Sequence, residues 1–226
     1  MYDDDDSLSR TCPRKFLGRT EISRFSPFLS MSCPLASHES PATTYSSYLC
    51  IPELLALQSP KTDTPDELLF IITHQSHELW FKQIIQDLQE CNRKIRCFAS
   101  SSEQGSYEVC ITMIDRCSKI FLVLRDSLQI LQTMDPKEFQ RFRPALGTSS
   151  GLQSDQWRSV EAELQILGRA PNLQRTLLTL ETAVTAWRTA HEILAEKMIG
   201  IGIKGTGGTS GVDYLKSKAG SSIFSA

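Results

Sequence analysis

The chain has 226 residues, of which 40% are hydrophobic and 22% are charged, and its formal net charge is -2. This length is enough for one domain with a sizeable core, and the composition is ordinary for a globular protein. The near-neutral charge gives no electrostatic reason to expect nucleic acid or an anionic membrane as a partner. No apolar run approaches the roughly 20 residues that a membrane-spanning helix needs. We therefore expect neither nucleic acid nor a membrane among the partners.

The chain contains seven cysteines, an odd number, and none of them forms a Cys-x-x-Cys pair. This pattern favours free thiols in a reducing, cytoplasmic compartment over a disulfide framework. It also argues against a zinc site built from cysteine thiolates.

The first part of the chain differs in composition from the rest. Residues 1–43 are rich in serine, proline and threonine and have no clean hydrophobic periodicity. They open with an acidic run, Asp3 to Asp6, where a secretory signal would have basic residues followed by an apolar core. We predict a disordered tail over 1–43 and a single helical domain over 44–226.

From Tyr45 onward, apolar residues recur at helical spacing, and no stretch alternates with a period of two for long. The pattern predicts an all-α fold, a helical bundle in which each helix buries an apolar stripe. Capping residues and prolines mark helix starts, as in Asp135 before Pro136. The predicted helices cover about 48–57, 65–97, 107–134, 136–143, 152–167 and 172–200, and the polar stretch 201–211 is predicted as a loop.

Two of the four histidines lie on the apolar stripe of the helix predicted over 65–97. Phe70, His74, His77 and Phe81 are spaced 4-3-4 and so share one helix face. A polar ring on a buried face costs free energy unless it has a partner. A lone histidine in this setting is usually a core residue bonded to a carbonyl, but two on one stripe point to a site.

The last predicted long helix repeats this arrangement with Val184, Trp187 and His191. Two helices whose apolar faces each carry a histidine indicate an apolar pocket that contains a few functional polar groups. A His-x-x-His metal site would lack a third local ligand, because Glu78 lies off the face of His74 and His77. A haem needs only one axial histidine, and apolar neighbours of His191 such as Trp187 suit one face of it.

Two further features are open to a functional interpretation. Arg143 lies between aromatic residues and is either an ordinary surface arginine or a clamp for a carboxylate. The stretch Gly200–Gly205 matches Gly-x-Gly-x-x-Gly, but it follows a helix rather than a strand, so a dinucleotide site is rejected. The glycine-rich loop is better explained as backbone that approaches a ligand, with hydroxyls from Thr206, Thr209 and Ser210.

Four blocks together resemble the tryptophan 2,3-dioxygenase family, and they occur in the family's order. They are Tyr45–Leu49, Thr73–Gln83, Ser150–Ser154 and Gly205–Gly211. The resemblance implies an all-α enzyme that holds haem b and is commonly a homotetramer. Its reaction inserts both atoms of O2 across the indole C2–C3 bond of L-tryptophan, which gives N-formylkynurenine.

The resemblance also implies roles for individual residues. His191 matches the iron ligand, and His74 matches the catalytic histidine beside the indole nitrogen. Ser150 and Gly151 match positions that line the pocket, where with Trp187 we expect them to contact the cofactor. The expected substrate-binding residues are Phe70, Arg143 and Thr206, together with Tyr45, Tyr48 and Leu49, whose segment in the family reaches into a neighbouring subunit's pocket.

This chain departs from the family pattern at four points. The connection from Ser150 to His191 is far shorter, and the spacing from His191 to Thr206 is one residue longer. His77 stands where a tyrosine is expected, and the family's usual C-terminal helix is not expected after Tyr214.

These departures leave other functions open. A haem-dependent monooxygenase of tryptophan or a substituted tryptophan is the main alternative. A haem sensor without turnover and a bundle with purely structural histidines are two more, although a sensor would need no amino-acid clamp.

Overall fold

The computed structural model of the chain describes residues 42–100, 107–170 and 172–224. The disordered tail predicted over 1–43 lies almost wholly outside the described residues. Helices account for the regular structure from Tyr45 onward, and no strand occurs among the described residues, which confirms the all-α prediction. The elements are α1 (Tyr45–Leu49), α2 (Ile51–Leu55), α3 (Pro65–Ser100), α4 (Glu108–Leu131), α5 (Pro136–Phe142), the 3-10 turns η1 (Arg143–Leu146) and η2 (Gly151–Gln153), α6 (Asp155–Leu167), α7 (Gln174–Ile199) and α8 (Val212–Ala219).

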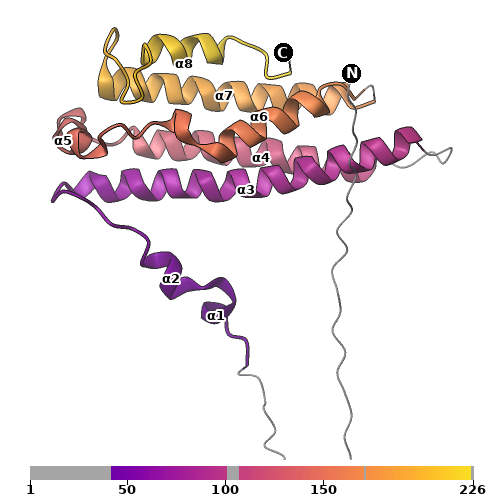
Figure 1. The fold of residues 1–226 in the computed structure, drawn as a ribbon, viewed down its shortest axis with the longest axis horizontal. Coiled ribbons are helices and arrows are strands. Elements are labelled where there is room, and N and C mark those ends of the chain that lie inside the picture. The colour runs from indigo at the N-terminus through magenta and orange to yellow at the C-terminus, as the bar shows by residue number, and fades with distance from the viewer. Residues whose placement is uncertain (1–41, 101–106, 171, 225–226) are drawn as a thin grey trace, which may run out of the picture. The chain divides into compact units, whose positions relative to one another are not determined.

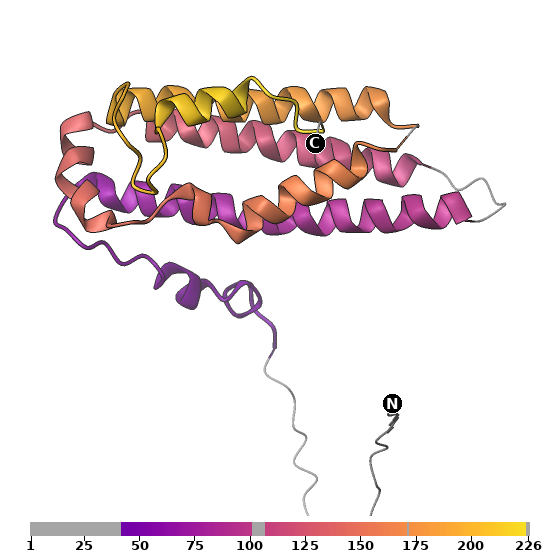
Figure 2. The same cartoon turned by 45° about the horizontal axis from the view of Figure 1, so that its top comes forward.

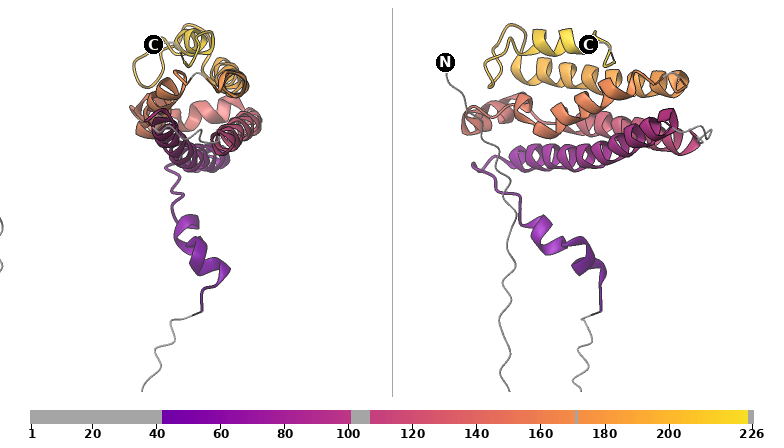
Figure 3. Two further views of the ribbon diagram at one scale, coloured as in Figure 1. Left: turned by 90° about the vertical axis from the view of Figure 1, so that its right-hand side faces the viewer. Right: turned by 45° about the vertical axis from the view of Figure 1, so that its right-hand side comes forward.

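Four long helices form the bundle, with their axes roughly along one direction (Figures 1 and 2). α3 packs against both α4 and α6, and α4 packs against α7. The view along the axes shows these four helices arranged around a common centre, with α8 lying outside on α7 (Figure 3). In the part of the chain that the structure describes, no helix is long and apolar enough to cross a membrane.

Local signals in the sequence explain where the connecting elements begin. The Asp135 side chain accepts a hydrogen bond from the Lys137 amide at 2.8 Å, and Pro136 occupies the first turn of α5. Ser154 caps α6 in the same way by accepting from the Trp157 amide at 3.0 Å. These caps fix the ends of short elements, so the chain reverses at defined points beside the bundle.

One prediction about this part of the chain was wrong, and one helix was not predicted. The single helix predicted over 152–167 is divided into η2 and α6, because the capping side chain of Ser154 starts a new helix. No helix was predicted around Tyr214, and this residue lies within α8. Val212 is the only residue that α8 buries, so the segment has no apolar stripe by which to recognise it.

Polar side chains tie α3 to α6 along their length. Asn92 donates to both the backbone carbonyl of Glu163, at 3.1 Å, and its carboxylate, at 2.8 Å. Gln156 donates to the Glu78 carbonyl at 2.8 Å. The buried Asn92 amide thereby avoids the cost of an unpaired polar group, and together with the half-buried Gln156 it fixes the register of the two helices.

α6 and α7 meet through large side chains rather than through close backbone packing. The rings of Trp157 on α6 and Trp187 on α7 are 4.7 Å apart between centroids. Both rings also contact Phe121 on α4 and Phe81 on α3, with centroid distances of 5.5 to 6.3 Å. This aromatic cluster fills one part of the bundle centre and holds α6 and α7 apart.

His77 is buried beside this cluster, with 8% of its surface exposed. Its Nδ1 lies 2.8 Å from the Thr73 carbonyl oxygen, which can only accept, so Nδ1 carries the ring proton. Its Nε2 is one of two buried side-chain nitrogens without a hydrogen-bond partner among the described residues, the other being Trp187 Nε1. Burial lowers the pKa of His77 to about 4, against the opposing effect of the Thr73 carbonyl.

The buried, neutral His77 makes stability depend on pH. In the unfolded chain this ring has its ordinary pKa of 6.5, so its stabilisation is complete above that pH and is lost as pH falls toward 4. Between pH 7 and pH 5 we expect the unfolding free energy of the unchanged chain to fall by about 2 kcal/mol more than that of His77→Phe, which has no ring to protonate. Urea denaturation of both proteins at the two pH values measures this difference, and equal pH slopes would contradict the prediction.

Candidate functional site

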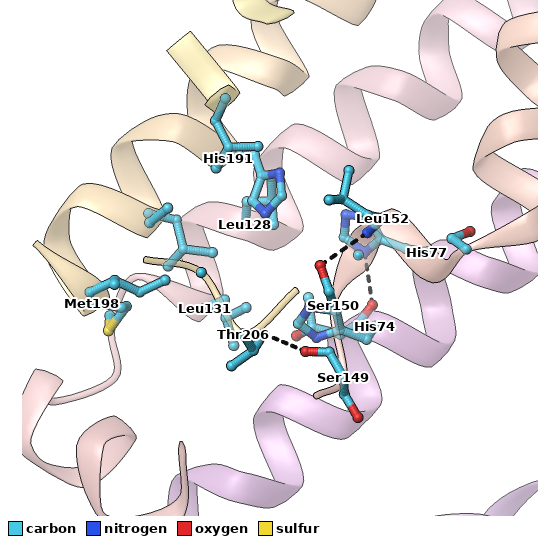
Figure 4. A pocket seen from close by; sticks show the side chains of 18 of the residues that line it. His74, His77, Leu128, Leu131, Ser149, Ser150, Leu152, His191, Met198 and Thr206 are labelled. Carbon is cyan, nitrogen blue, oxygen red and sulfur yellow. Dashed lines mark hydrogen bonds between the residues drawn. The ribbon is translucent and has the colours of Figure 1, made fainter. Parts of the chain in front are cut away.

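A cavity of about 290 Å³ lies among α3, α4, α6, α7 and α8, near the lower end of the roughly 300–1,000 Å³ found for small-molecule sites. Its walls combine apolar side chains of the bundle with a polar edge formed by two loops. Figure 4 shows His191 on one side of this space and His74 and His77 on the other. The residues that the sequence assigned to a site and that line the cavity are Phe70, His74, His77, Arg143, Ser150, Gly151, Trp187, His191 and Thr206.

The α3 wall carries Phe70 and His74 one helical turn apart. Nδ1 of His74 lies 2.7 Å from the Phe70 carbonyl oxygen, so Nδ1 is the protonated nitrogen and Nε2 is left as an acceptor. The two rings are 4.0 Å apart, and Phe142 supports Phe70 at 5.5 Å between centroids. Burial by surrounding protein lowers the pKa of His74, while its open side faces the cavity.

The α7 wall carries His191, whose ring stacks on Trp187 at a centroid distance of 6.3 Å and an angle of 24°. Burial, followed by the nearby charges of His74 and His77, lowers the pKa of His191 to about 4. The ring is therefore neutral near pH 7, and a nitrogen lone pair is available to a ligand. Leu128, Leu131 and Met198 line the same region, so the surroundings of this ring are apolar (Figure 4).

The polar edge joins two segments that are distant in sequence. The Thr206 hydroxyl donates to the Ser149 carbonyl oxygen, and Arg143 Nη2 donates to the Lys204 carbonyl at 3.0 Å. Ser150 starts η2 by a capping box with Gln153, which holds this segment in a fixed turn. The loop after α7 is thus attached to the segment before α6, and both contribute to the cavity.

Glycine makes this loop contact possible. A Cβ atom at Gly207 would lie 2.6 Å from the Ser150 hydroxyl oxygen and 2.7 Å from its Cβ, distances that side chains do not tolerate. Gly211, at a φ of 63°, starts α8 and packs directly against the Ile203 carbonyl. The loop therefore needs glycine for its close approach to Ser150 and for its sharp entry into α8, whereas the predicted approach to a ligand stays a prediction.

The structure leaves the predicted N-terminal contacts outside this chain's own cavity. Tyr45, Tyr48 and Leu49 lie on α1 with 79%, 76% and 42% of their surface exposed. Their expected place is a neighbouring subunit's pocket, which a single chain does not test. Their role therefore stays a prediction, as do the roles of the residues that line the cavity.

Sequence reasoning missed a second charged group in the cavity wall. It consists of Glu161 on α6, Arg188 on α7 and Lys218 on α8. A signal for Arg188 was present, because it lies four residues after Val184 and three before His191, on the buried side of α7. An arginine on a buried stripe is rare unless it is paired, and this one was overlooked among apolar neighbours.

The cavity suits haem better than a bare metal ion. No group of three or more His, Cys, Asp or Glu side chains that could hold a metal ion occurs among the described residues. A tetrapyrrole supplies four nitrogen ligands itself, so it needs only an axial imidazole and apolar walls. His191 offers a neutral imidazole that makes no hydrogen bond to any described residue, and Leu128, Leu131 and Met198 supply apolar walls beside it.

Comparison with known proteins gives one consistent result. The family model for tryptophan 2,3-dioxygenase matches residues 30–170, which is more than half of the chain. The tryptophan 2,3-dioxygenase of Ruegeria sp. (strain TM1040) is 41% identical over 135 residues, covering 59% of this chain and 45% of that protein. The enzyme of the same name from Anaeromyxobacter sp. (strain K) is 37% identical over 128 residues, covering 57% and 46%.

A third relative aligns over a longer range. The tryptophan 2,3-dioxygenase of Caulobacter vibrioides is 30% identical over 249 residues, covering 77% of this chain and 92% of that protein. An alignment longer than the 226-residue chain must contain gaps on this chain's side. Against the Ruegeria and Anaeromyxobacter relatives, the chain spans about half of their length.

The family model matches more than half of the chain, and the relatives that align with it share one name. The predicted resemblance is thereby confirmed. The chain belongs to the tryptophan 2,3-dioxygenase family, a family of enzymes.

Proposed function

We propose that this chain binds haem b and catalyses the insertion of both atoms of O2 into L-tryptophan, which opens the indole C2–C3 bond and gives N-formylkynurenine. The observation that carries the proposal is a single cavity that brings His191, His74 and Arg143 together in a member of this family. Haem b, when bound, supplies the iron at which oxygen binds and reacts. His191 would hold that iron through its neutral ring.

The charged ends of the amino acid fit the polar edge of the cavity. Arg143 offers a guanidinium with several donors, of which one is used by the Lys204 carbonyl. The Thr206 hydroxyl already donates to the Ser149 carbonyl, so its oxygen lone pairs remain free to accept from an ammonium group. This pairing would fix the backbone of tryptophan and leave its side chain directed toward the apolar walls.

His74 would orient the indole rather than move a proton. Its Nδ1–H donates to the Phe70 carbonyl, so Nε2 can only accept, and an indole N–H is a matching donor. Burial lowers the pKa of His74, so the ring is neutral and holds no second proton near pH 7. The Phe70 ring packs at 4.0 Å from it and would form an aromatic wall that excludes water. Fixed orientation of the substrate is itself a large contribution to catalysis.

We also propose assembly into a homo-oligomer in which α1 completes a neighbour's pocket. Tyr45 and Tyr48 support this, because large aromatic side chains with more than three quarters of their surface exposed gain free energy when a partner covers them. Sedimentation of the full chain tests the assembly.

Isotope labelling tests the reaction. The haem-loaded, reduced full chain is given L-tryptophan under labelled O2, and the product is analysed by mass spectrometry. We expect two labelled oxygen atoms in the product. One labelled atom would contradict the proposal and support the monooxygenase alternative, which no relative's name favours, and no product would remove tryptophan as the substrate.

Removal of the guanidinium tests the carboxylate clamp. We expect Arg143→Ala to raise the KM for tryptophan roughly 10- to 100-fold, because a charge-assisted hydrogen bond is lost in a partly buried site. Arg141→Ala is the matched control, since Arg141 lies on α5 two residues before Arg143 but pairs with Glu138 and Asp63 at the surface. Steady-state kinetics measures both variants, and an unchanged KM in Arg143→Ala would show that the clamp assignment is wrong.

A further inference from the structure

Arg188 is a buried cation in the cavity wall that the proposed reaction does not use. It lies on α7, three residues before His191, with 8% of its surface exposed. Its Nη2 donates to the Glu161 carboxylate on α6 at 3.0 Å, and its Cζ lies 5.6 Å from the centroid of the Trp157 ring. Burial lowers its pKa, but the adjacent carboxylate offsets this and an arginine stays charged.

The other half of the guanidinium faces the C-terminal end of α8. Nη1 donates to the Lys218 carbonyl at 3.0 Å and to the Ser221 carbonyl at 3.3 Å. The Lys218 carbonyl also accepts from the Ser221 hydroxyl at 3.0 Å and from the Ser221 amide at 3.4 Å, so Arg188 adds a charged donor to a carbonyl that is already paired. A cation at the negative end of a helix dipole stabilises that helix end. Arg188 therefore connects three helices, α6, α7 and α8, through one rigid group.

α8 has few other attachments. It packs against α7 alone among the described elements, and Val212 at its first position is the only residue that it buries. Beyond α8, Ile223 enters the core, and Phe224 lies so close to Gly168 that a Cβ there would meet it at 2.9 Å. A helix with little buried apolar surface unfolds or detaches locally at low cost in free energy, so its position depends on individual hydrogen bonds.

The position of α8 matters because α8 forms part of the cavity wall. Tyr214 and Lys218 line the cavity, and the loop that leads into α8 carries Thr206. That loop is held at its far end by the contacts with Ser149 and Ser150 described above. If α8 moved as one rigid element, Val212 would leave its buried position and the loop would be held only by its contacts with Ser149 and Ser150.

We infer that Arg188 is a positioning residue, which clamps the C-terminal carbonyls of α8 and thereby fixes the wall that carries Thr206. The planar guanidinium is required because its donors point at Glu161 on one side and at two carbonyls on the other. A lysine ammonium is a point charge on a flexible chain and would keep only part of this geometry. The effect on substrate binding rests on the proposed function, whereas the effect on α8 does not.

Hydrogen exchange of the full chain, followed by mass spectrometry, tests the clamp directly. In Arg188→Met, which keeps an apolar stem, we expect the amides of 212–220 to exchange about tenfold faster, while those of α4 keep their rates. Arg188→Lys should exchange at an intermediate rate. Arg93→Met is the matched control, because Arg93 is an exposed arginine paired with Glu90 on its own helix.

Two outcomes would overturn the inference. If α8 exchange stays unchanged in Arg188→Met, the guanidinium does not hold that helix, and a role in binding an anionic ligand group would then explain its burial. If α4 exchange rises with that of α8, Arg188 only supports the stability of the whole bundle. Neither measurement needs cofactor or turnover, so failure here is distinct from failure of the proposed reaction.

Kinetics adds a measurement that a purely structural role would not affect selectively. In the haem-loaded enzyme, Arg188→Met should raise the KM for tryptophan about tenfold with a smaller change in kcat, because Thr206 is displaced while His74 and His191 are not. Arg188→Lys should show a smaller rise in KM than Arg188→Met. Equal losses in kcat and in kcat/KM, without a change in KM, would contradict a positioning role.

Discussion

The structure depends on the placement of three neutral imidazole rings around one apolar cavity, with His77 buried, His191 half-buried and His74 open to the cavity. The Nδ1–H groups of His74 and His77 each donate a hydrogen bond to a carbonyl one turn earlier on α3. His191, opposite them, makes no such bond and keeps a free lone pair, with its pKa lowered to about 4. Burying ionisable groups has a cost in free energy, which is accepted here only because the rings stay uncharged. α3 and α7 therefore both supply imidazole rings to the same cavity.

The second constraint is the closure of that cavity by segments with little core of their own. The loop after α7 contacts the segment before α6 at two points: Gly207 lies against the Ser150 side chain, and the Thr206 hydroxyl donates to the Ser149 carbonyl. At the other end of α8, Arg188 provides the connection to α6 and α7. The apolar bundle is thus rigid by packing, whereas the polar wall is held by a few directed hydrogen bonds. Affinity and selectivity are expected to be most sensitive to changes in that wall.

The sequence predicted the bundle well, because long helices with apolar stripes are its clearest signal. It also grouped His74 and His191, since the 4-3-4 spacing places each on the apolar stripe of its helix. The positions of Arg143 and Thr206 followed from the family resemblance and not from periodicity. The sequence did not predict α8, because a helix with one buried residue has no apolar stripe. It did not predict the contacts of Arg188 with Glu161 and Lys218 either, because hydrogen bonds between three helices depend on tertiary packing.

The measurement that tests this account most directly is a haem titration of the full chain, followed by absorption spectroscopy. We expect one haem to bind per chain with the spectrum of an iron–histidine complex. His191→Ala should lose that spectrum, added imidazole should restore it, and His38→Ala, a change at the remaining histidine of the chain, should have no effect. An unchanged spectrum and affinity in His191→Ala would contradict the assignment of His191 and of the cavity that it faces.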